Sequence, residues 1–322
     1  MDGGLIVDKP AGSTSHDVVQ AVRGLLGERR IGHLGTLDPF ATGVLVLLIG
    51  RATRLARFYG QREKTYQGVI RFGFATDTMD HTGSPLSEDT FPTLREADLR
   101  TAFAGFVGPY AQRPPAYSAK KISGVPAYRL ARKGLPVELS KVPVVIHALE
   151  LRCVDGARAG FHATVSSGTY LRSLVNDIGE RMRVGAHLAE LRRTSVGEFA
   201  ESNALKLDDL REKWERSEEV LIPLQDLLPE LPRVELDESE AKHAGHGSDL
   251  TLPLSADRVR MMDPQGRLVG IAERIAENLY HPVVVLITDC RGTSEAAGAG
   301  AGSRSGGSTL LKTMLVLCGA AY

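Results

Sequence analysis

The side chain best placed to do chemistry is Asp38, within the glycine-punctuated stretch GHLGTLDPFATGVL at residues 32–45. The glycines relieve backbone sterics and let a ligand approach closely. Pro39 biases the residue before it away from the helical region, so we expect the carboxylate on extended backbone. Such an acid is either a catalytic group or a turn former, and on residue types alone Asp before Pro favours the turn.

Hydrophobic spacing predicts the elements that must position Asp38. Residues 3–9 read as a strand, and the Ser-Thr-Ser at 13–15 offers an N-cap for an amphipathic helix that Gly27 ends. The Asp38 loop leads into an apolar strand at 44–49 and a short helix around 53–59. These elements place the loop between an amphipathic helix and a buried strand.

From Lys64 the apolar period changes to two, with Tyr66, Gly68, Ile70, Phe72 and Phe74 on one face of a strand. A helix is expected at 96–107, and a second alternating strand at 161–165 runs into a helix that starts near Leu171. Strands separated by helices, without repeated βαβ units, predict an α+β domain on a mixed or antiparallel sheet.

The remaining stretches divide the chain. Residues 112–134 are rich in Pro, Gly, Lys and Arg, which predicts an exposed loop with a short helix. An acidic, proline-containing boundary at 222–232 precedes a second region with short strand-like runs and a turn at 263–266, typical of a small β domain. Residues 292–308 are low in complexity, and the apolar run 310–317 could form a final strand.

Composition bounds the class of protein. The 322 residues are 43% hydrophobic, enough for one large and one small domain, and no apolar run approaches the roughly 20 residues of a membrane helix. The N-terminal sequence has no basic region before an apolar one, so we expect no signal peptide. Three distant cysteines suit a reducing cytoplasm. His243 and His246 lack further ligands at metal spacing, so we expect no metal.

The net charge of zero hides an asymmetry. Residues 1–200 hold 26 Lys and Arg against 19 Asp and Glu, whereas residues 201–322 hold 13 against 20. Residues 113–152 alone carry eight basic and two acidic side chains. Such a basic stretch is typical of a surface that binds the phosphate backbone of a nucleic acid. An ordinary solvated protein surface explains it equally well.

The Asp38 stretch resembles the signature loop of the TruB family, the bacterial tRNA pseudouridine-55 synthases, in which this Asp is the nucleophile. The resemblance extends over most of the chain to about Leu286. It includes GLIVDKP at 4–10 with GSTS at 12–15, where the family's Lys-Pro pair packs near the active site. We therefore assign Lys9 a supporting role, and read Asp8 and Ser15 as a strand end and a helix cap.

Four further residues take roles from this resemblance. Tyr66 would stack on the target uracil and assist proton transfer, although an aromatic on such a strand is usually core. Arg172 would hold Asp38 bidentately and keep it ionised by lowering its pKa; the alternative is a surface helix arginine. Leu191 would pack against the base or serve as plain core. His33 would contact RNA near the extruded nucleotide.

The resemblance also assigns the larger segments. A catalytic domain would span residues 1–228, with a thumb-like insertion at about 113–143 whose Lys120, Lys121 and Arg132 would help to clamp the T-arm of tRNA. A PUA-like β domain would span residues 232–290. The Gly/Ser-rich segment and hydrophobic tail at 291–322 have no assigned role.

These features predict a cytoplasmic tRNA uridine-to-pseudouridine isomerase. It would flip out the T-loop uridine at position 55 and use no cofactor. We expect a monomer with no obligate protein partner and no membrane. The alternatives are a guide-RNA-dependent pseudouridine synthase that needs partner proteins, a non-catalytic RNA-binding or tRNA-folding protein, and a nucleoside glycosylase. No second carboxylate is evident beside Asp38, which argues against ordinary glycoside hydrolysis.

Overall fold

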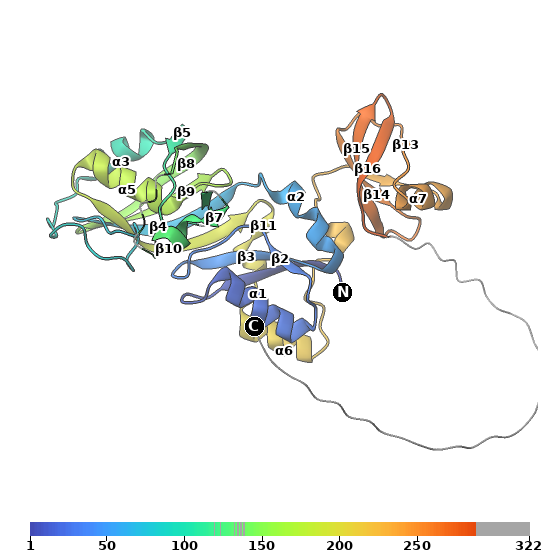
Figure 1. Cartoon of the computed structure of the whole chain (residues 1–322), viewed down its shortest axis with the longest axis horizontal. Coiled ribbons are helices and arrows are strands. Elements are labelled where there is room, and N and C mark those ends of the chain that lie inside the picture. Colours follow the sequence, from blue (N-terminus) through green and yellow to red (C-terminus); the bar gives the residue numbers. More distant parts are fainter. Residues whose placement is uncertain are drawn as a thin grey trace, which may run out of the picture. The chain divides into compact units, whose positions relative to one another are not determined.

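Figure 1 shows the protein as a computed structural model of the whole chain. The structure describes residues 1–287 except Ala119, Ser123, Arg132, Gly134, Pro136 and Glu138. The predicted low-complexity segment and final strand, at 292–308 and 310–317, therefore lie outside the described residues. Among the residues described, no helix is long and apolar enough to cross a membrane.

The first sheet has nine strands, in the order β1-β3-β10-β4-β9-β8-β5, with β2 on β3 and β11 on β10. The strands are β1 Gly3–Lys9, β2 Ile31–His33, β3 Thr42–Ile49, β4 Lys64–Phe72, β5 Gly108–Gln112, β8 Val142–Asp155, β9 Arg158–Val165, β10 Ala186–Val196 and β11 Phe199–Ala200. The contact of β3 with β10 is parallel and the other pairings are antiparallel. The prediction of an α+β fold on a mixed sheet is confirmed.

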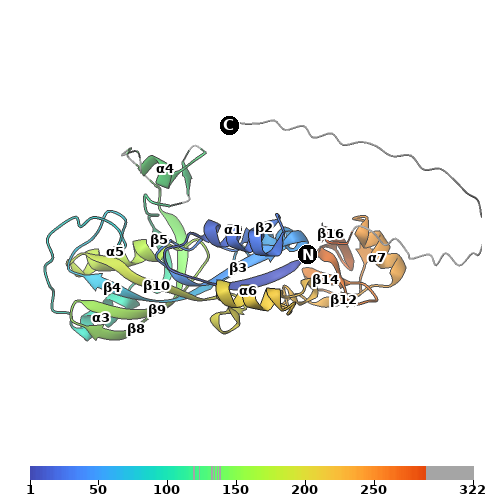
Figure 2. The same ribbon diagram turned by 90° about the horizontal axis from the view of Figure 1, so that it is seen from below.

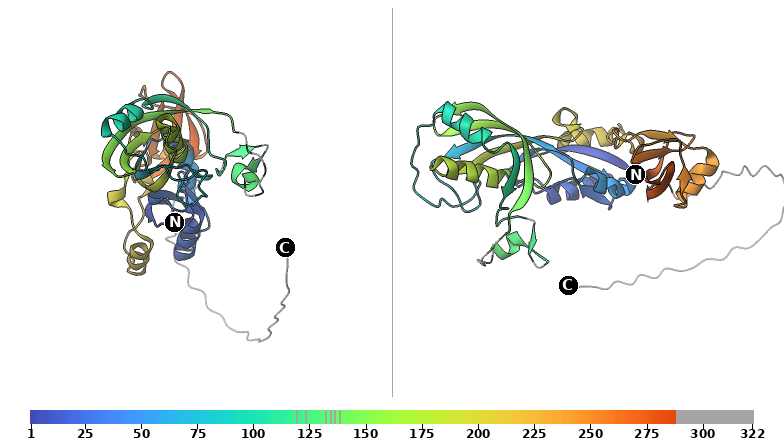
Figure 3. Two further views of the ribbon diagram at one scale, coloured as in Figure 1. Left: turned by 90° about the vertical axis from the view of Figure 1, so that its left-hand side faces the viewer. Right: turned by 90° about the horizontal axis from the view of Figure 1, so that it is seen from above.

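This part of the chain also forms helices, most of which pack on the sheet. They are α1 Ser15–Leu26, α2 Ala56–Tyr59, α3 Glu96–Ala104, α4 Ala127–Ala131, α5 Leu171–Met182 and α6 Leu207–Glu215, with 3-10 turns at Gly50–Leu55, Glu201–Asn203 and Leu224–Asp226. Thr14 caps α1 through a capping box with Asp17, and Gly27 ends it in the left-handed conformation. In Figures 2 and 3, α4 stands off the sheet beside a small hairpin of β6 Lys121–Ile122 and β7 Val125–Pro126.

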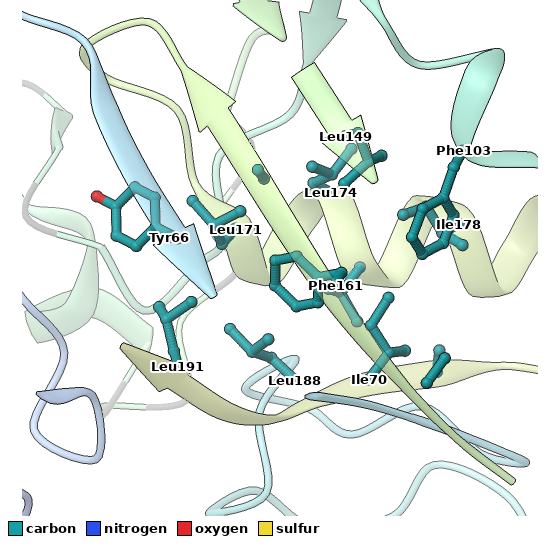
Figure 4. Close-up of a cluster of buried hydrophobic side chains, with 14 of the residues drawn as sticks. Tyr66, Ile70, Phe103, Leu149, Phe161, Leu171, Leu174, Ile178, Leu188 and Leu191 are labelled. Carbon is teal, nitrogen blue, oxygen red and sulfur yellow. The ribbon is translucent and has the colours of Figure 1, made fainter. Parts of the chain in front are cut away.

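Two apolar clusters fill the space between this sheet and its helices. One lies under α3 and α5, where Ile70 and Phe161 of the sheet meet Ile178 of α5 (Figure 4). The other joins α1 and α6 to β1 and β3, and contains Val22 and Leu47. Strand β3 is almost fully buried along its length, which anchors the Asp38 loop that precedes it.

The second sheet belongs to residues 233–287. Its strands are β12 Arg233–Glu235, β13 Leu250–Thr251, β14 Arg258–Met262, β15 Leu268–Ala276 and β16 Leu279–Val285, in the order β12-β14-β15-β16-β13, with helix α7 Glu238–Gly245 beside them. Asp263 accepts a hydrogen bond from the backbone N–H of Gln265, so the predicted turn is confirmed. Val46 and Leu48 of the first sheet share one apolar cluster with Met262 and Ile271.

Some elements differ from the sequence prediction. Strand β4 ends at Phe72 because Gly73 takes φ of +123°, so the alternation does not continue to Phe74. Strand β8 was not predicted, because register shifts at 146–148 and 151–153 break its period of two. Helices α6 and α7 were also missed. They cover only narrow apolar stripes, and the capping box of α7 at Asp237 and Glu240 was the available signal.

Candidate active site

Asp38, Tyr66 and Arg172 line one cavity of about 500 Å³. They come from three places in the chain: the loop before β3, the start of β4 and the first turn of α5. The other lining residues are Gly35, Thr36, Leu37, Pro39, Lys64, Tyr117, Ser118, Ser167, Gly168, Thr169, Tyr170, Leu171 and Leu191. The fold therefore brings Asp38 and Arg172, which lie 134 positions apart in sequence, into one cavity.

The Asp38 loop is held from its N-terminal side by Ser15 and Lys9. Ser15 Oγ accepts a hydrogen bond from Leu37 N at 2.9 Å and lies 3.2 Å from Leu37 O. The Nζ of Lys9, which is fully buried, donates to the carbonyls of Ser13 at 2.6 Å and Pro39 at 3.2 Å. The interpretation of Ser15 as the helix cap is therefore wrong: Thr14 caps α1, and Ser15 fixes the loop through Leu37.

The same loop is held from the sheet side by Arg193, which sequence reasoning missed. Arg193 is fully buried on β10, and its guanidinium donates to Val44 O at 2.7 Å and Gly35 O at 3.0 Å. Gly43 makes this contact possible: its φ is +100°, and a Cβ there would lie 2.2 Å from Arg193 O. The available signal in the sequence was that a second basic residue, Arg193, directly follows Arg192. Arg192 lies on the opposite side of the strand.

Arg172 faces both oxygens of Asp38. Its Nη2 donates to Asp38 Oδ1 at 3.0 Å, and its Nε lies 2.8 Å from Oδ2. The guanidinium also donates to Thr78 O at 3.0 Å and Tyr117 O at 2.8 Å. Only 5% of the Arg172 side chain is exposed, so it is a buried pocket residue, not a surface helix arginine. These contacts fix the direction of the carboxylate.

A second carboxylate, Asp80, completes this network and was not found from the sequence. Its Oδ2 lies 3.5 Å from Arg172 Nη1. Its Oδ1 accepts hydrogen bonds from Thr78 Oγ1 at 2.8 Å and from Thr82 N at 2.9 Å. Asp80 is buried, it faces Arg172, and it is not among the residues that line the cavity.

The pKa of Asp38 differs from the sequence prediction. Burial raises the pKa of this carboxyl above its usual range, Arg172 opposes the rise, and Asp80 adds to it. We had expected Arg172 to bring the pKa below the usual range, but the desolvation of the carboxyl is the larger effect. A third of the Asp38 side chain remains exposed, so a ligand in the cavity can reach it.

Tyr66 and Leu191 form the apolar wall of the cavity. Tyr66 is 6% exposed and belongs to the cluster under α5. In Figure 4 its ring lies beside Leu171 and Leu191 at the end of that cluster, with the hydroxyl directed away from the labelled apolar side chains. Tyr66 and Leu191 are therefore both core residues and cavity residues, because the end of this apolar cluster forms the wall of the cavity.

Other predicted site residues lie elsewhere. His33, on β2, is half-buried and is not among the residues that line the cavity. Burial, followed by the nearby Arg193, lowers the pKa of its imidazole. Lys120 is half-buried in the segment before α4, while the Lys121 side chain and Arg132 lie outside the described residues. In the described part of the chain, no three His, Cys, Asp or Glu side chains gather as metal ligands would.

Two family models match the chain in succession. The one described as TruB family pseudouridylate synthase (N terminal domain) matches residues 23–171, and the one described as tRNA pseudouridylate synthase B C-terminal domain matches residues 172–231. Two relatives named tRNA pseudouridine synthase B, from Solibacter usitatus and Thermobifida fusca, are 44% and 41% identical to this chain. Their alignments cover 89% and 88% of this chain, and 100% and 98% of the relatives.

Solved structures share the fold at lower identity. One is described as an H/ACA RNP bound to a substrate RNA containing 2′-deoxyuridine, with a TM-score of 0.68 and 24% identity. Another is a Cbf5-Nop10-Gar1 complex, with a TM-score of 0.69 and 24% identity. Each alignment covers 88% of this chain and 85% of the other. At this identity the likeness shows a common fold.

Proposed function

The chain belongs to the TruB family of pseudouridylate synthases, and from this premise we propose that it isomerises uridine to pseudouridine in tRNA. The observation that carries the proposal is one carboxylate, Asp38, oriented by Arg172 in a cavity whose wall is Tyr66. The names of the relatives support tRNA as the substrate. The target is the T-loop uridine at position 55, as the family resemblance implies.

The reaction needs one reactive carboxylate and no redox partner. The C–N glycosidic bond of uridine breaks, the uracil turns, and a new bond joins the ribose to carbon 5 of the base. The hydrogen on carbon 5 leaves as a proton and the freed ring nitrogen gains one, so atoms and electrons balance without a cofactor. This chemistry fits a site with one acid, one aromatic wall and one arginine.

Asp38 is the nucleophile in this proposal. Two routes use it as a nucleophile, by attack on the ribose C1′ as in a retaining glycosidase or by addition to carbon 6 of the base; in a third it acts instead as a base that abstracts a ribose proton to give a glycal. Each requires the ionised carboxylate near the sugar or the base. Arg172 serves all three by fixing the direction of Asp38 and by opposing the rise in its pKa. The family resemblance further implies that Tyr66 takes part in proton transfer.

The target base must leave its stack to reach Asp38. Flipping a base costs a few kcal/mol of unstacking. Stacking on Tyr66, with Leu191 beside it, offsets part of that cost. A loop uridine costs less to extrude than a paired base, which agrees with a target in the T-loop.

We assign the rest of the RNA contact to the basic segments. Residues 113–143 act as the thumb, in which Lys120, Lys121 and Arg132 contact T-arm phosphates, and His33 contacts RNA near the flipped nucleotide. Residues 1–228 form the catalytic domain and residues 232–290 the PUA-like domain. We expect a cytoplasmic monomer that acts without partner proteins, in contrast to the Cbf5-Nop10-Gar1 assembly.

The test is to incubate the purified chain alone with an unmodified tRNA transcript and to map pseudouridine by carbodiimide treatment and primer extension. We expect one stop in the T-loop, absent with Asp38→Asn. A stop elsewhere would reject the T-loop position. No stop, with tRNA binding retained, would favour the RNA-binding or partner-dependent alternative, and release of free uracil would identify a glycosylase.

A further inference from the structure

Lys64 is a buried cation in the cavity to which the reaction gives no role. It is the first residue of β4, two before Tyr66, and therefore lies on the same side of the strand. Its side chain is 9% exposed and its Nζ donates to Ser167 Oγ at 3.0 Å. Among the residues that the structure describes, no carboxylate lies within ion-pair distance of this ammonium.

Packing alone does not account for a lysine at this position. Its Cε lies 3.0 Å from the point where a Cβ on Gly35 would be, so the alkyl chain fills the space beside that glycine. A methionine would fill that space without burying a charge. Burial, with Arg193 nearby, lowers the pKa of Lys64 to about 8, which reflects the cost of an ammonium without a counter-ion.

The other charges around the cavity already have partners. Arg172 faces Asp38 and Asp80, while Lys9 and Arg193 donate to backbone carbonyls. These four cations, Lys64 included, surround two carboxylates, which leaves an excess of positive charge in the described part of the site. Ser167 occupies one of the three hydrogen donors of Lys64 Nζ, which leaves two for a ligand.

We propose that Lys64 and Ser167 Oγ bind a phosphodiester group that flanks the target uridine and so place its ribose over Asp38. This inference rests on the proposed function. The apolar wall at Tyr66 suits the base, whereas Ser167 adjoins Gly168, which is exposed at the rim. Two residues along a strand span about 7 Å, a distance of the order that separates a base from its own phosphate. One nucleotide can therefore contact Tyr66 and Lys64 together.

The experiment measures binding of a T-arm stem–loop in which one linkage beside the target uridine is a neutral methylphosphonate. The linkages on the two sides are tested separately. Each RNA carries a 2′-O-methyl ribose on the 5′ side of the altered linkage to prevent cleavage, and the reference RNA has the same methyl group with an ordinary phosphate. We expect the wild type to lose about tenfold in affinity at one of the two linkages.

The Lys64 variants assign that loss. Lys64→Gln should bind the reference RNA about tenfold more weakly and lose nothing further at the neutral linkage, and its log–log salt slope should fall by about 0.7. Lys64→Arg keeps the charge and should keep the linkage dependence. Lys64→Met replaces Lys64→Gln if the latter does not fold. Lys242→Gln, on exposed α7, should match the wild type in every measurement.

Two results would overturn the inference: a wild type insensitive at both linkages, or a Lys64→Gln variant that loses as much as the wild type at the neutral linkage. Pseudouridine formation by the wild type on unmodified RNA is measured in parallel. If pseudouridine forms without any linkage dependence, the phosphate site is rejected and the proposed function stands. If linkage dependence is seen without pseudouridine, the proposed function is rejected instead.

Discussion

The cavity around Asp38 and the β region at 233–287 treat charged side chains in opposite ways. Around the cavity, Lys9, Arg172, Arg193 and Asp80 are buried, with partners on other elements. In the β region, Arg258 pairs with Glu273 at 2.9 Å and Arg274 pairs with Asp257 at 2.8 Å, and both pairs are largely exposed. Its apolar cluster includes Tyr280, and Asp263 is buried in the turn after β14, where it accepts hydrogen bonds from Gln265 N and Arg267 N.

The difference indicates where the protein does its chemistry. Burying a charge is unfavourable unless a network or a ligand compensates it, whereas an exposed pair contributes about 0–1 kcal/mol. The charged side chains around the cavity are therefore buried at a cost in stability, in an arrangement that orients Asp38. The paired charges of the β region are solvated at its surface. Substitutions around the cavity should therefore lower activity more than substitutions in the β region. They should also lower stability more.

The largest effect is expected for Asp38→Asn. The amide keeps the shape of the side chain but is a poor nucleophile, so the single-turnover rate should fall by about 10⁴-fold or more. The rate is measured as tritium released from tRNA that carries uridine labelled at carbon 5, because the hydrogen on that carbon leaves in the reaction. Affinity for tRNA should stay within a few-fold. A rate within tenfold of the wild type would exclude Asp38 as the nucleophile.

Arg172→Lys should lower the same rate by about 10²-fold, since lysine cannot face both Asp38 oxygens and also donate to Thr78 O and Tyr117 O. Arg158→Lys is the matched control, because among the residues described the side chain of Arg158 pairs with the exposed Glu190 alone. A loss of equal size in the two variants would show that the contacts of the Arg172 guanidinium with Asp38 make no particular contribution to the rate.

The pH dependence of kcat/KM should report the raised pKa of Asp38. The carboxylate is the active form, so activity should be lost on acidification at a pH above the usual carboxyl range. Arg172→Gln removes the charge that opposes this rise, so its acid limb should move to still higher pH. An acid limb in the usual carboxyl range for both proteins would contradict the burial argument.

Gly43→Ala should destabilise the protein by about 3 kcal/mol, because it combines a positive φ with a clash against the backbone of Arg193. Gly27→Ala is the control: its φ is +66°, but nothing lies within 4 Å of the added Cβ, and about 1 kcal/mol is expected. The two midpoints of urea unfolding give the comparison. Equal losses would mean that the close approach of Gly43 to the Arg193 backbone adds nothing to the cost of the positive φ.

The smallest effect is expected in the β region. Arg274→Ala breaks an exposed pair with Asp257 and should change the free energy of unfolding by no more than about 0.5 kcal/mol. The isomerisation rate should not change. A clear loss of activity in this variant would give the β region a part in the reaction that its exposed charges do not indicate.

Local patterns predicted the elements around Asp38 well. The cap at Thr14, the stop at Gly27 and the buried strand β3 all follow from residues close together in sequence. Strand β8 was missed because its bulges disturb the period that identifies a strand. Strand β10, which carries Leu191 and Arg193, was not predicted either, so the sequence predicted the loop and the elements that flank it in the chain better than the rest of the sheet.

The site itself was only partly predictable. The loop motif pointed to Asp38, but Arg193 binds carbonyls that come into reach only when the loop folds over β10. Asp80 meets Arg172 across 92 positions of sequence, with no spacing to signal it. The direction of the pKa shift of Asp38 depends on how many atoms surround the carboxyl, and no sequence pattern reports that number.

The most direct test of the isomerase account is a nucleoside balance on a single unmodified tRNA. The purified chain is incubated with the transcript, the RNA is digested, and uridine, pseudouridine and free uracil are quantified by mass spectrometry. The account predicts one equivalent of pseudouridine per tRNA, a matching loss of uridine and no free uracil. Free uracil, or an unchanged uridine content with tRNA bound, would contradict it.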